Sequence, residues 1–178
     1  MNKRQVMIVA VIAVIAGFFA GMQFSGTSVE AQAQRPQAAP AAASNAKEPV
    51  ATADEFKSHV LHYPDLPPVE LVKGSNSRLV AGEQSMISFL RMDANSYFAP
   101  HTHPQEQIMI VLDGECDEII QGKLYHVKKG DVIVLPPNIE HGAYIGPRDV
   151  DVIDVFGYPR SDYLLKMMQK MTEMPKKP

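Results

Sequence analysis

The 178-residue chain is long enough for one ordinary domain with a tail, but too short for two large domains. Hydrophobic residues make up 46% of the sequence, which excludes wholesale disorder, and a net charge of −3 without any tryptophan argues against a nucleic-acid-binding module. The single cysteine, Cys116, excludes an intrachain disulfide and a metal site made of cysteines alone.

The first 33 residues have the pattern of an export signal. Lys3 and Arg4 form a positive start, and residues 6–22 then run without a charge. Residues 31–33 read Ala-Gln-Ala, a sequence suited to signal-peptide cleavage. We expect residues 1–33 to be either a signal peptide that is removed or a helical signal anchor that is kept. In both cases the positive-inside rule predicts a periplasmic or otherwise extracytoplasmic body, secreted or anchored.

Residues 34–53 are expected to form a disordered linker. The stretch 31–53 contains ten alanines among its 23 residues, together with Pro36, Pro40 and Pro49. Such a composition cannot bury enough apolar surface to fold. If the anchor is kept, the linker tethers the following domain, residues 54–178, to a membrane.

The body of the chain alternates short apolar runs with turn sequences. Asp113-Gly114, Lys129-Gly130 and Gly146-Pro147 are among the turn signals. Seven runs have the length of a strand and are rich in Ile, Val, Phe and Tyr: 85–92, 107–112, 115–120, 123–127, 132–135, 142–145 and 150–156. This spacing predicts an all-β sandwich or barrel.

Beyond Pro159 the pattern becomes helical. Ser161 is a suitable N-cap residue. The apolar residues that follow recur at helical spacing: Tyr163, Leu164, Met167, Met168 and Met171. We predict a C-terminal helix whose methionine stripe packs on the barrel and does not bind metal.

Three histidines and a glutamine form a candidate metal site. His101 and His103 are two residues apart beside strand sequence, so alternation directs both imidazoles to one face. Gln107 has the same parity and opens the next strand, and His141 opens another strand after a Pro-Pro-Asn turn. Such a set suits a divalent first-row metal with open coordination positions. The alternative is that these histidines are unrelated core or surface residues.

At this point the sequence resembles the cupin superfamily. The first cupin motif runs Gly, five residues, His-x-His, three or four residues, Glu, six residues, Gly. Residues 95–114 of this chain read N-SYFAP-HTH-PQE-Q-IMIVLD-G, which fits that spacing. Asn95 replaces the first glycine, a mild change because Asn tolerates a left-handed backbone, and Gln107 replaces the glutamate.

The second cupin motif runs Gly, five residues, Pro, any residue, Gly, two residues, His. Residues 130–141 read G-DVIVL-P-P-N-IE-H, with Asn138 in place of the middle glycine. The resemblance covers about residues 70–163. It implies a double-stranded β-helix, that is a jelly-roll barrel, with the C-terminal helix attached, so that residues 54–178 are a cupin domain.

The resemblance also implies that His101, His103, Gln107 and His141 bind a divalent metal ion, which we expect to be Zn, Mn, Ni or Fe. Glu106 competes with Gln107 for the third position, because a slip of one residue reverses the face of a strand. A neutral glutamine leaves the metal more positive than a glutamate would. The predicted ligand is therefore an anionic small molecule.

A second group of polar residues lies downstream. Asp154 stands between Ile153 and Val155, so it is expected to be the one carboxylate of an apolar interior, with a raised pKa suited to acid/base work. Arg160 is suited to binding a carboxylate through two hydrogen bonds. The alternative is a structural Asp154–Arg160 salt bridge. The spacing D-x-F-x-x-x-R resembles small cupins that ketonise unsaturated uronates and cupin-type dimethylsulfoniopropionate lyases.

Three functions follow from this pattern, and whether the protein is an enzyme stays open. The first is an exported metal-dependent isomerase or lyase that moves a proton on a carboxylate- or carbonyl-containing substrate, such as a sugar acid, with Asp154 and Arg160 as catalytic residues. The second is a non-catalytic domain that binds or senses a small ligand, and the third is a metal-dependent dioxygenase. No nucleic-acid partner is expected.

A homodimer is also expected. The even-numbered residues Ile108, Ile110 and Leu112 give the back of one predicted strand a second apolar face.

Overall fold

The computed structural model describes residues 47–174, and the chain divides into two compact units between Leu61 and His62. The predicted signal or anchor over 1–33 and most of the predicted linker lie outside the described residues. Within residues 47–174, no helix combines the length and the apolar character needed to span a membrane.

The described part of the first unit contains one short helix, α1 (Ala53–His59). Thr52 Oγ1 accepts a hydrogen bond from the Glu55 backbone N–H at 3.3 Å, and the Glu55 carboxylate accepts one from the Thr52 N–H at 2.8 Å. This reciprocal capping box satisfies two backbone donors at the start of the helix. No residue of α1 is buried, so local capping rather than a packed face accounts for the helix.

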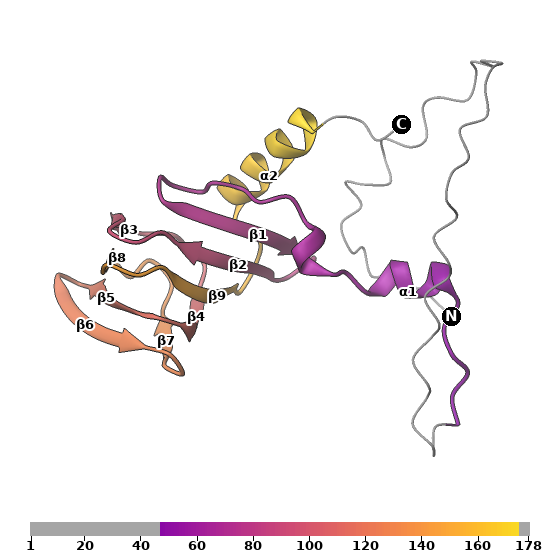
Figure 1. Ribbon diagram of the computed structural model, residues 1–178, viewed down its shortest axis with the longest axis horizontal. Coiled ribbons are helices and arrows are strands. Elements are labelled where there is room, and N and C mark those ends of the chain that lie inside the picture. Colours follow the sequence, from indigo (N-terminus) through magenta and orange to yellow (C-terminus); the bar gives the residue numbers. More distant parts are fainter. Residues whose placement is uncertain (1–46, 175–178) are drawn as a thin grey trace. The chain divides into compact units, whose positions relative to one another are not determined.

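The second unit is built from two antiparallel sheets (Figure 1). One sheet has the strand order β1-β2-β9-β4-β7 and the other has the order β3-β8-β5-β6. The strands are β1 (Ser75–Ala81), β2 (Met86–Met92), β3 (Tyr97–His101), β4 (Gln107–Asp113), β5 (Glu115–Ile120), β6 (Lys123–Lys128), β7 (Val132–Leu135), β8 (His141–Ile145) and β9 (Val150–Phe156). A short 3-10 helix, η1 (Tyr63–Asp65), precedes the sheets, and the helix α2 (Ser161–Glu173) follows them.

Two strands were not predicted from the sequence. β1 begins with polar residues, yet Ser77 is fully buried. Its burial is tolerated because its hydroxyl forms a hydrogen bond of 2.7 Å with that of Ser88 on the neighbouring strand. β3 contains Pro100, which has no backbone N–H to donate and therefore argues against a strand. The pairing of β3 with β8 is irregular between Phe98 and His101, and this irregularity accommodates the proline.

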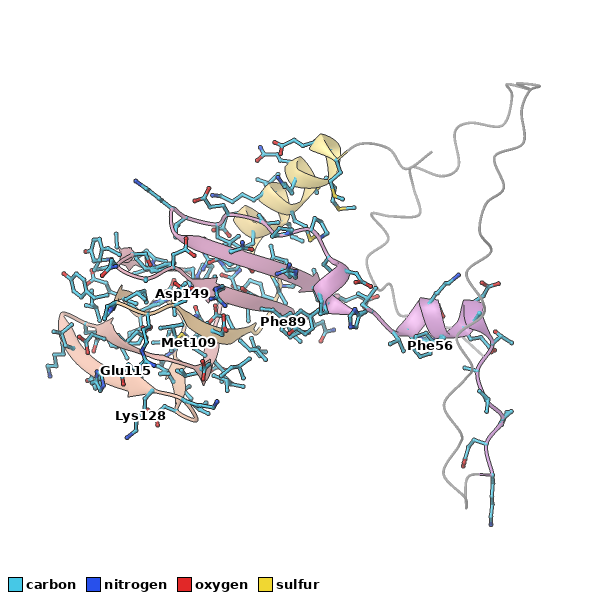
Figure 2. All side chains as sticks on the ribbon, in the orientation of Figure 1. Phe56, Phe89, Met109, Glu115, Lys128 and Asp149 are labelled. Atoms are coloured by element: carbon cyan, nitrogen blue, oxygen red, sulfur yellow. The ribbon has the colours of Figure 1, made fainter. Side chains whose placement is uncertain are left out.

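The apolar core lies between the two sheets. Met109 and Val111, which share the parity of Gln107, are 4% and 1% exposed, as their alternation predicts. Outside the core, Glu115 and Lys128 face each other as a register pair on the β5–β6 hairpin and are exposed (Figure 2). Inward positions on these strands are mostly apolar. A polar residue at an inward position therefore indicates a functional site.

The helix α2 packs beside β1 over a second apolar cluster (Figure 1). Met167 is buried, and Tyr163, Leu164 and Met171 are partly buried against this cluster. Met168, predicted to belong to the packed stripe, is 47% exposed, so that part of the prediction is wrong. The predicted N-cap is also displaced. Ser161 is the first helical residue, and the N-cap position belongs to Arg160, whose side chain makes no capping bond.

The turn residues adopt the backbone conformations that the sequence predicts. Asn95 and Asn138, which stand where the cupin motifs have glycine, have φ angles of 60° and 61°. These values lie in the left-handed region, which asparagine tolerates better than most residues. The two replacements therefore keep the turns that lead into the two histidine-bearing segments.

Candidate functional site

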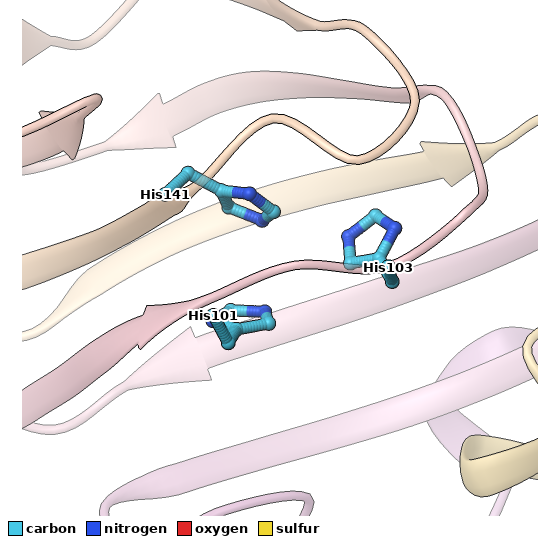
Figure 3. A group of neighbouring side chains, drawn as sticks. All are labelled: His101, His103 and His141. Atoms are coloured by element: carbon cyan, nitrogen blue, oxygen red, sulfur yellow. The ribbon is translucent and has the colours of Figure 1, made fainter.

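Three histidine rings converge at one end of the barrel (Figure 3). His101 ends β3 and is paired in register with His141, which begins β8, while His103 follows in the next loop. One ring nitrogen from each residue lies within 4.8 Å of those of the other two. The ring centroids of His101 and His141 are 4.5 Å apart, and those of His103 and His141 are 5.0 Å apart.

Backbone carbonyl groups orient two of these rings. Nδ1 of His101 lies 3.1 Å from the Ala99 carbonyl oxygen, and Nδ1 of His141 lies 3.0 Å from that of Ile139. A carbonyl oxygen only accepts, so Nδ1 carries the proton in both rings. The lone pair of each neutral ring is then on Nε2, which is the arrangement that a metal-binding histidine needs.

The histidine cluster fits a divalent first-row metal ion. Burial lowers the pKa of His141 to about 4. Burial and the positive charge of Arg160 also lower the pKa of His103. Neutral imidazole is the form that binds metal, so these two donors are ready at neutral pH. Within the described residues, Nδ1 of His103 is buried without a hydrogen-bond partner, which marks this end of the barrel as a place for a polar ligand.

Gln107 connects the histidines to Asp154. Its side-chain oxygen accepts a hydrogen bond from His103 Nε2 at 3.0 Å, and its amide nitrogen donates one to Asp154 Oδ1 at 2.8 Å. Gln107 is 7% exposed, whereas Glu106 is exposed. The structure therefore brings Gln107 into the cluster and leaves Glu106 at the surface, where strand alternation directs it.

A cavity of about 540 Å³ opens beside the histidines. Both sheets contribute to its wall, and Tyr163 and Lys166 of α2 line it from the helix. Its polar lining includes His101, Gln107, Glu118, His141, Asp154 and Arg160. Met109, Leu90 and Phe98 supply apolar surface. A concave, largely apolar space with a few convergent polar groups is the usual form of a small-molecule site.

Asp154 lies on β9, lines this cavity and is 4% exposed. Burial raises its pKa to about 7, against the opposing effects of the Gln107 hydrogen bond and the Arg160 charge. The sequence predicted a raised pKa for Asp154, with desolvation in an apolar interior as its cause.

Asp154 is not the one carboxylate of the interior, contrary to the expectation from sequence. Glu118 on β5, in the opposite sheet, is 3% exposed and lines the same cavity. Burial, with the charge of Asp154, raises the pKa of Glu118 to about 8. A signal for this residue exists in the sequence, because Glu118 has the same strand parity as the buried Cys116.

Arg160 is buried at the start of α2 but does not pair with Asp154. Its Nε and Nη2 donate to the Asp162 carboxylate at 3.2 Å and 2.7 Å, so the predicted structural alternative, an Asp154–Arg160 salt bridge, is wrong. The guanidinium carbon lies 3.9 Å from the centroid of the Tyr163 ring. In the described part of the chain, Nη1 of Arg160 is buried without a hydrogen-bond partner.

Other residues singled out from the sequence lie elsewhere. His126 is exposed on β6, and its Nδ1 lies 2.9 Å from an Asp117 carboxylate oxygen. Cys116 is buried in the core, and desolvation raises its pKa to about 12, which makes it unreactive.

Comparison with known proteins relates this barrel to one family. Residues 88–156 match the family model described as "Cupin domain". An RmlC-like cupin from Shewanella frigidimarina is 23% identical with a TM-score of 0.54, over 59% of this chain and 95% of that one. KdgF from a Halomonas species is 25% identical with a TM-score of 0.53, over 56% of this chain and 93% of that one.

A third solved structure has a similar fold. The polyketide cyclase RemF from Streptomyces resistomycificus is 23% identical with a TM-score of 0.52, over 57% of this chain and 80% of that one. Among curated proteins, none matches this sequence.

Proposed function

Because the barrel belongs to the cupin superfamily, we propose that it binds a divalent metal ion and moves a proton on a small anionic substrate that carries a carboxylate or carbonyl group. The reaction class is that of an isomerase or a lyase. The observation that carries this proposal is the cluster of three histidines, two of which, His101 and His141, line the cavity together with Asp154 and Arg160.

His101, His103 and His141 are the nitrogen donors for the metal, and the Gln107 side-chain oxygen is the fourth ligand. When bound, the ion would supply Lewis-acid polarisation of a substrate oxygen. Imidazole and amide groups that bind a metal add no charge of their own, so the site keeps the positive charge of the ion. An anionic substrate is therefore attracted to the site, and a cationic one is repelled.

Asp154 and Arg160 have different tasks in this proposal. Asp154 faces the cavity beside Gln107, so its carboxyl group is placed to accept and return a proton of a substrate held at the histidines. Arg160 lines the cavity, and its Nη1 is buried without a hydrogen-bond acceptor in the described residues. In this proposal a substrate carboxylate supplies that acceptor. The resemblance of D-x-F-x-x-x-R to uronate-ketonising cupins supports a sugar acid as the substrate.

Elemental analysis of the purified full chain tests the metal site. About one zinc, manganese, nickel or iron ion per chain is expected, with loss in His101→Ala and in His141→Ala but not in the exposed control His126→Ala. Retention of the metal in both cavity variants would contradict the site.

Turnover then tests the reaction class. A panel of unsaturated uronates and other small acids should include a substrate that Asp154→Asn converts at least 100-fold more slowly than the wild type. Oxygen consumption by an iron-loaded protein would favour a dioxygenase instead. Metal binding without turnover of any acid would favour a non-catalytic binding or sensing domain.

We also propose an extracytoplasmic location, on the basis of the charge pattern of residues 1–33, which cell fractionation checks.

For the outer face of the five-stranded sheet we propose a second copy of this chain as the partner. Ile108 and Ile110 pair in register with Val134 and Val132, which are 58% and 57% exposed. An apolar patch such as these four residues form suits pairing with itself.

Analytical ultracentrifugation of the full chain in detergent tests the proposed dimer. Val134→Glu should shift it to monomer, whereas Leu124→Glu, at an equally exposed position on β6, should not. A wild-type monomer would overturn this proposal.

A further inference from the structure

We propose that Glu118 is a second proton-carrying residue of the cavity, which gives a proton to the substrate while Asp154 takes one from it. This inference rests on the proposed function, and it extends that function to a residue of the opposite sheet.

The position of Glu118 is the first argument. Its strand, β5, belongs to the four-stranded sheet, and β9, with Asp154, belongs to the five-stranded sheet. Both side chains point inward and line the same cavity, so the two carboxyl groups face a bound molecule from different sheets. An acid and a base on different sides of a substrate are what the transfer of a proton from one atom to another requires.

The surroundings of Glu118 are the second argument. Its only side-chain partner within the described residues is the Cys116 thiol, 4.0 Å from Oε1, and no Lys, Arg or His pairs with it there. A buried carboxyl group without a cation is stable when it carries its proton. The raised pKa of Glu118, about 8, agrees with this environment. A neutral carboxylic acid in an apolar site is suited to donate a proton or a hydrogen bond.

The two proton transfers together account for the conversion of an enol into a ketone. Asp154, as a carboxylate, takes the proton of the enol O–H group, and the oxygen forms a C=O bond. The electron pair of the C=C bond takes the Glu118 proton, so a new C–H bond forms as the Glu118 O–H bond breaks. Exchange of protons with solvent returns Glu118 to its acid form and Asp154 to its carboxylate.

The experiment uses the metal-loaded full chain, Glu118→Gln and the control Glu115→Gln, which removes an exposed carboxylate from the same strand. Glutamine keeps the shape of the side chain but has no proton to transfer. On the substrate found in the acid panel, Glu118→Gln should lower kcat at least 100-fold, leave KM within about 3-fold, and make deuterium addition at the product carbon in D2O less stereoselective. Glu115→Gln should behave like the wild type.

The pH profile distinguishes a proton donor from a structural residue. Wild-type kcat should fall as the pH rises through about 8, the pKa of Glu118, because the acid loses its proton. This limb should be absent from the residual activity of Glu118→Gln. If the wild type is active and Glu118→Gln retains its rate and its alkaline limb, this inference falls and the proposed function stands. If the wild type converts no acid of the panel, the proposed function falls, and this inference with it.

Discussion

Gln107 donates a hydrogen bond from its side-chain amide to Asp154 Oδ1 at 2.8 Å. A carboxylate only accepts, so this bond determines which end of the amide faces the histidines. The Gln107 oxygen is therefore directed at His103. An oxygen is the end of a glutamine that can bind a metal ion, so Asp154 orients Gln107 as well as facing the cavity.

Gln107→Glu should make the barrel less stable without metal and more responsive to metal. The change removes the donor to Asp154 and places a second carboxyl group against it, at a cost of about 1–3 kcal/mol. An anionic ligand then binds a divalent ion more tightly than the amide, so zinc should raise the melting temperature more than in the wild type. Thermal unfolding with chelator and with zinc measures both effects. Glu106→Gln, at the exposed neighbour, is the control, and equal zinc shifts in all three proteins would contradict the assignment.

Gly142→Ala should disturb the histidine cluster without touching a histidine. A Cβ atom at Gly142 would overlap with the Phe98 carbonyl oxygen and lie 2.9 Å from the Pro100 nitrogen, so β3 must move. Overpacking of this kind costs about 1–3 kcal/mol, and here it displaces the strand that ends at His101. Both the unfolding free energy and the zinc affinity should fall.

Gly146→Ala provides the matched control for this substitution. A Cβ atom at Gly146 meets nothing within 4 Å. Chemical denaturation and zinc titration should therefore leave this variant near the wild type. Normal zinc affinity in Gly142→Ala would show that β3 does not position His101.

Glu118→Gln should change how stability depends on pH. Folding raises the pKa of Glu118 from 4.5 to about 8, so its contribution to stability is complete below 4.5 and is lost as the pH rises through about 8. Each pKa unit corresponds to about 1.4 kcal/mol, so the loss is of the order of several kcal/mol. Urea unfolding in acid and in alkali should show a smaller loss of stability for Glu118→Gln than for the wild type. The raised pKa of Glu118 would be contradicted if Glu118→Gln lost as much stability between acid and alkali as the control Glu115→Gln does.

Tyr163→Leu should weaken the binding of acids through Arg160. The Tyr163 ring lies 3.9 Å from the guanidinium carbon, and a cation–π contact of this kind contributes about 0.5–2 kcal/mol. Without the ring, Arg160 loses the surface that orients its free N–H group. Calorimetric titration with galacturonate should show weaker binding for Tyr163→Leu, whereas Tyr163→Phe keeps the ring and should bind as the wild type does.

Much of the fold was predictable because strand parity and turn chemistry are local properties. Three predicted strands, 115–120, 132–135 and 150–156, have the bounds that the structure shows. β3 was missed because Pro100 argues against a strand, and only its pairing with β8 makes the irregular backbone acceptable.

The site residues that belong to one sequence motif were predictable. The way in which residues of the two sheets oppose each other was not. The His-x-His spacing and the parity of Gln107 predicted a cluster that the backbone does assemble. The parity of Glu118 is visible in the sequence, but its position in the same cavity as Asp154 depends on which inward-facing residues oppose each other across the barrel. A sequence does not contain that information, because it arises only when β5, β9 and α2 are packed.

The buried Nη1 of Arg160 has a consequence for selectivity. A buried donor left without an acceptor costs about 1–3 kcal/mol. A ligand that places an oxygen against this atom removes that cost, whereas an analogue of the same shape without the oxygen leaves it in place. The donor is unpaired before either ligand binds, so the cost that a substrate acid removes is the free energy by which this atom discriminates the acid from its uncharged analogue.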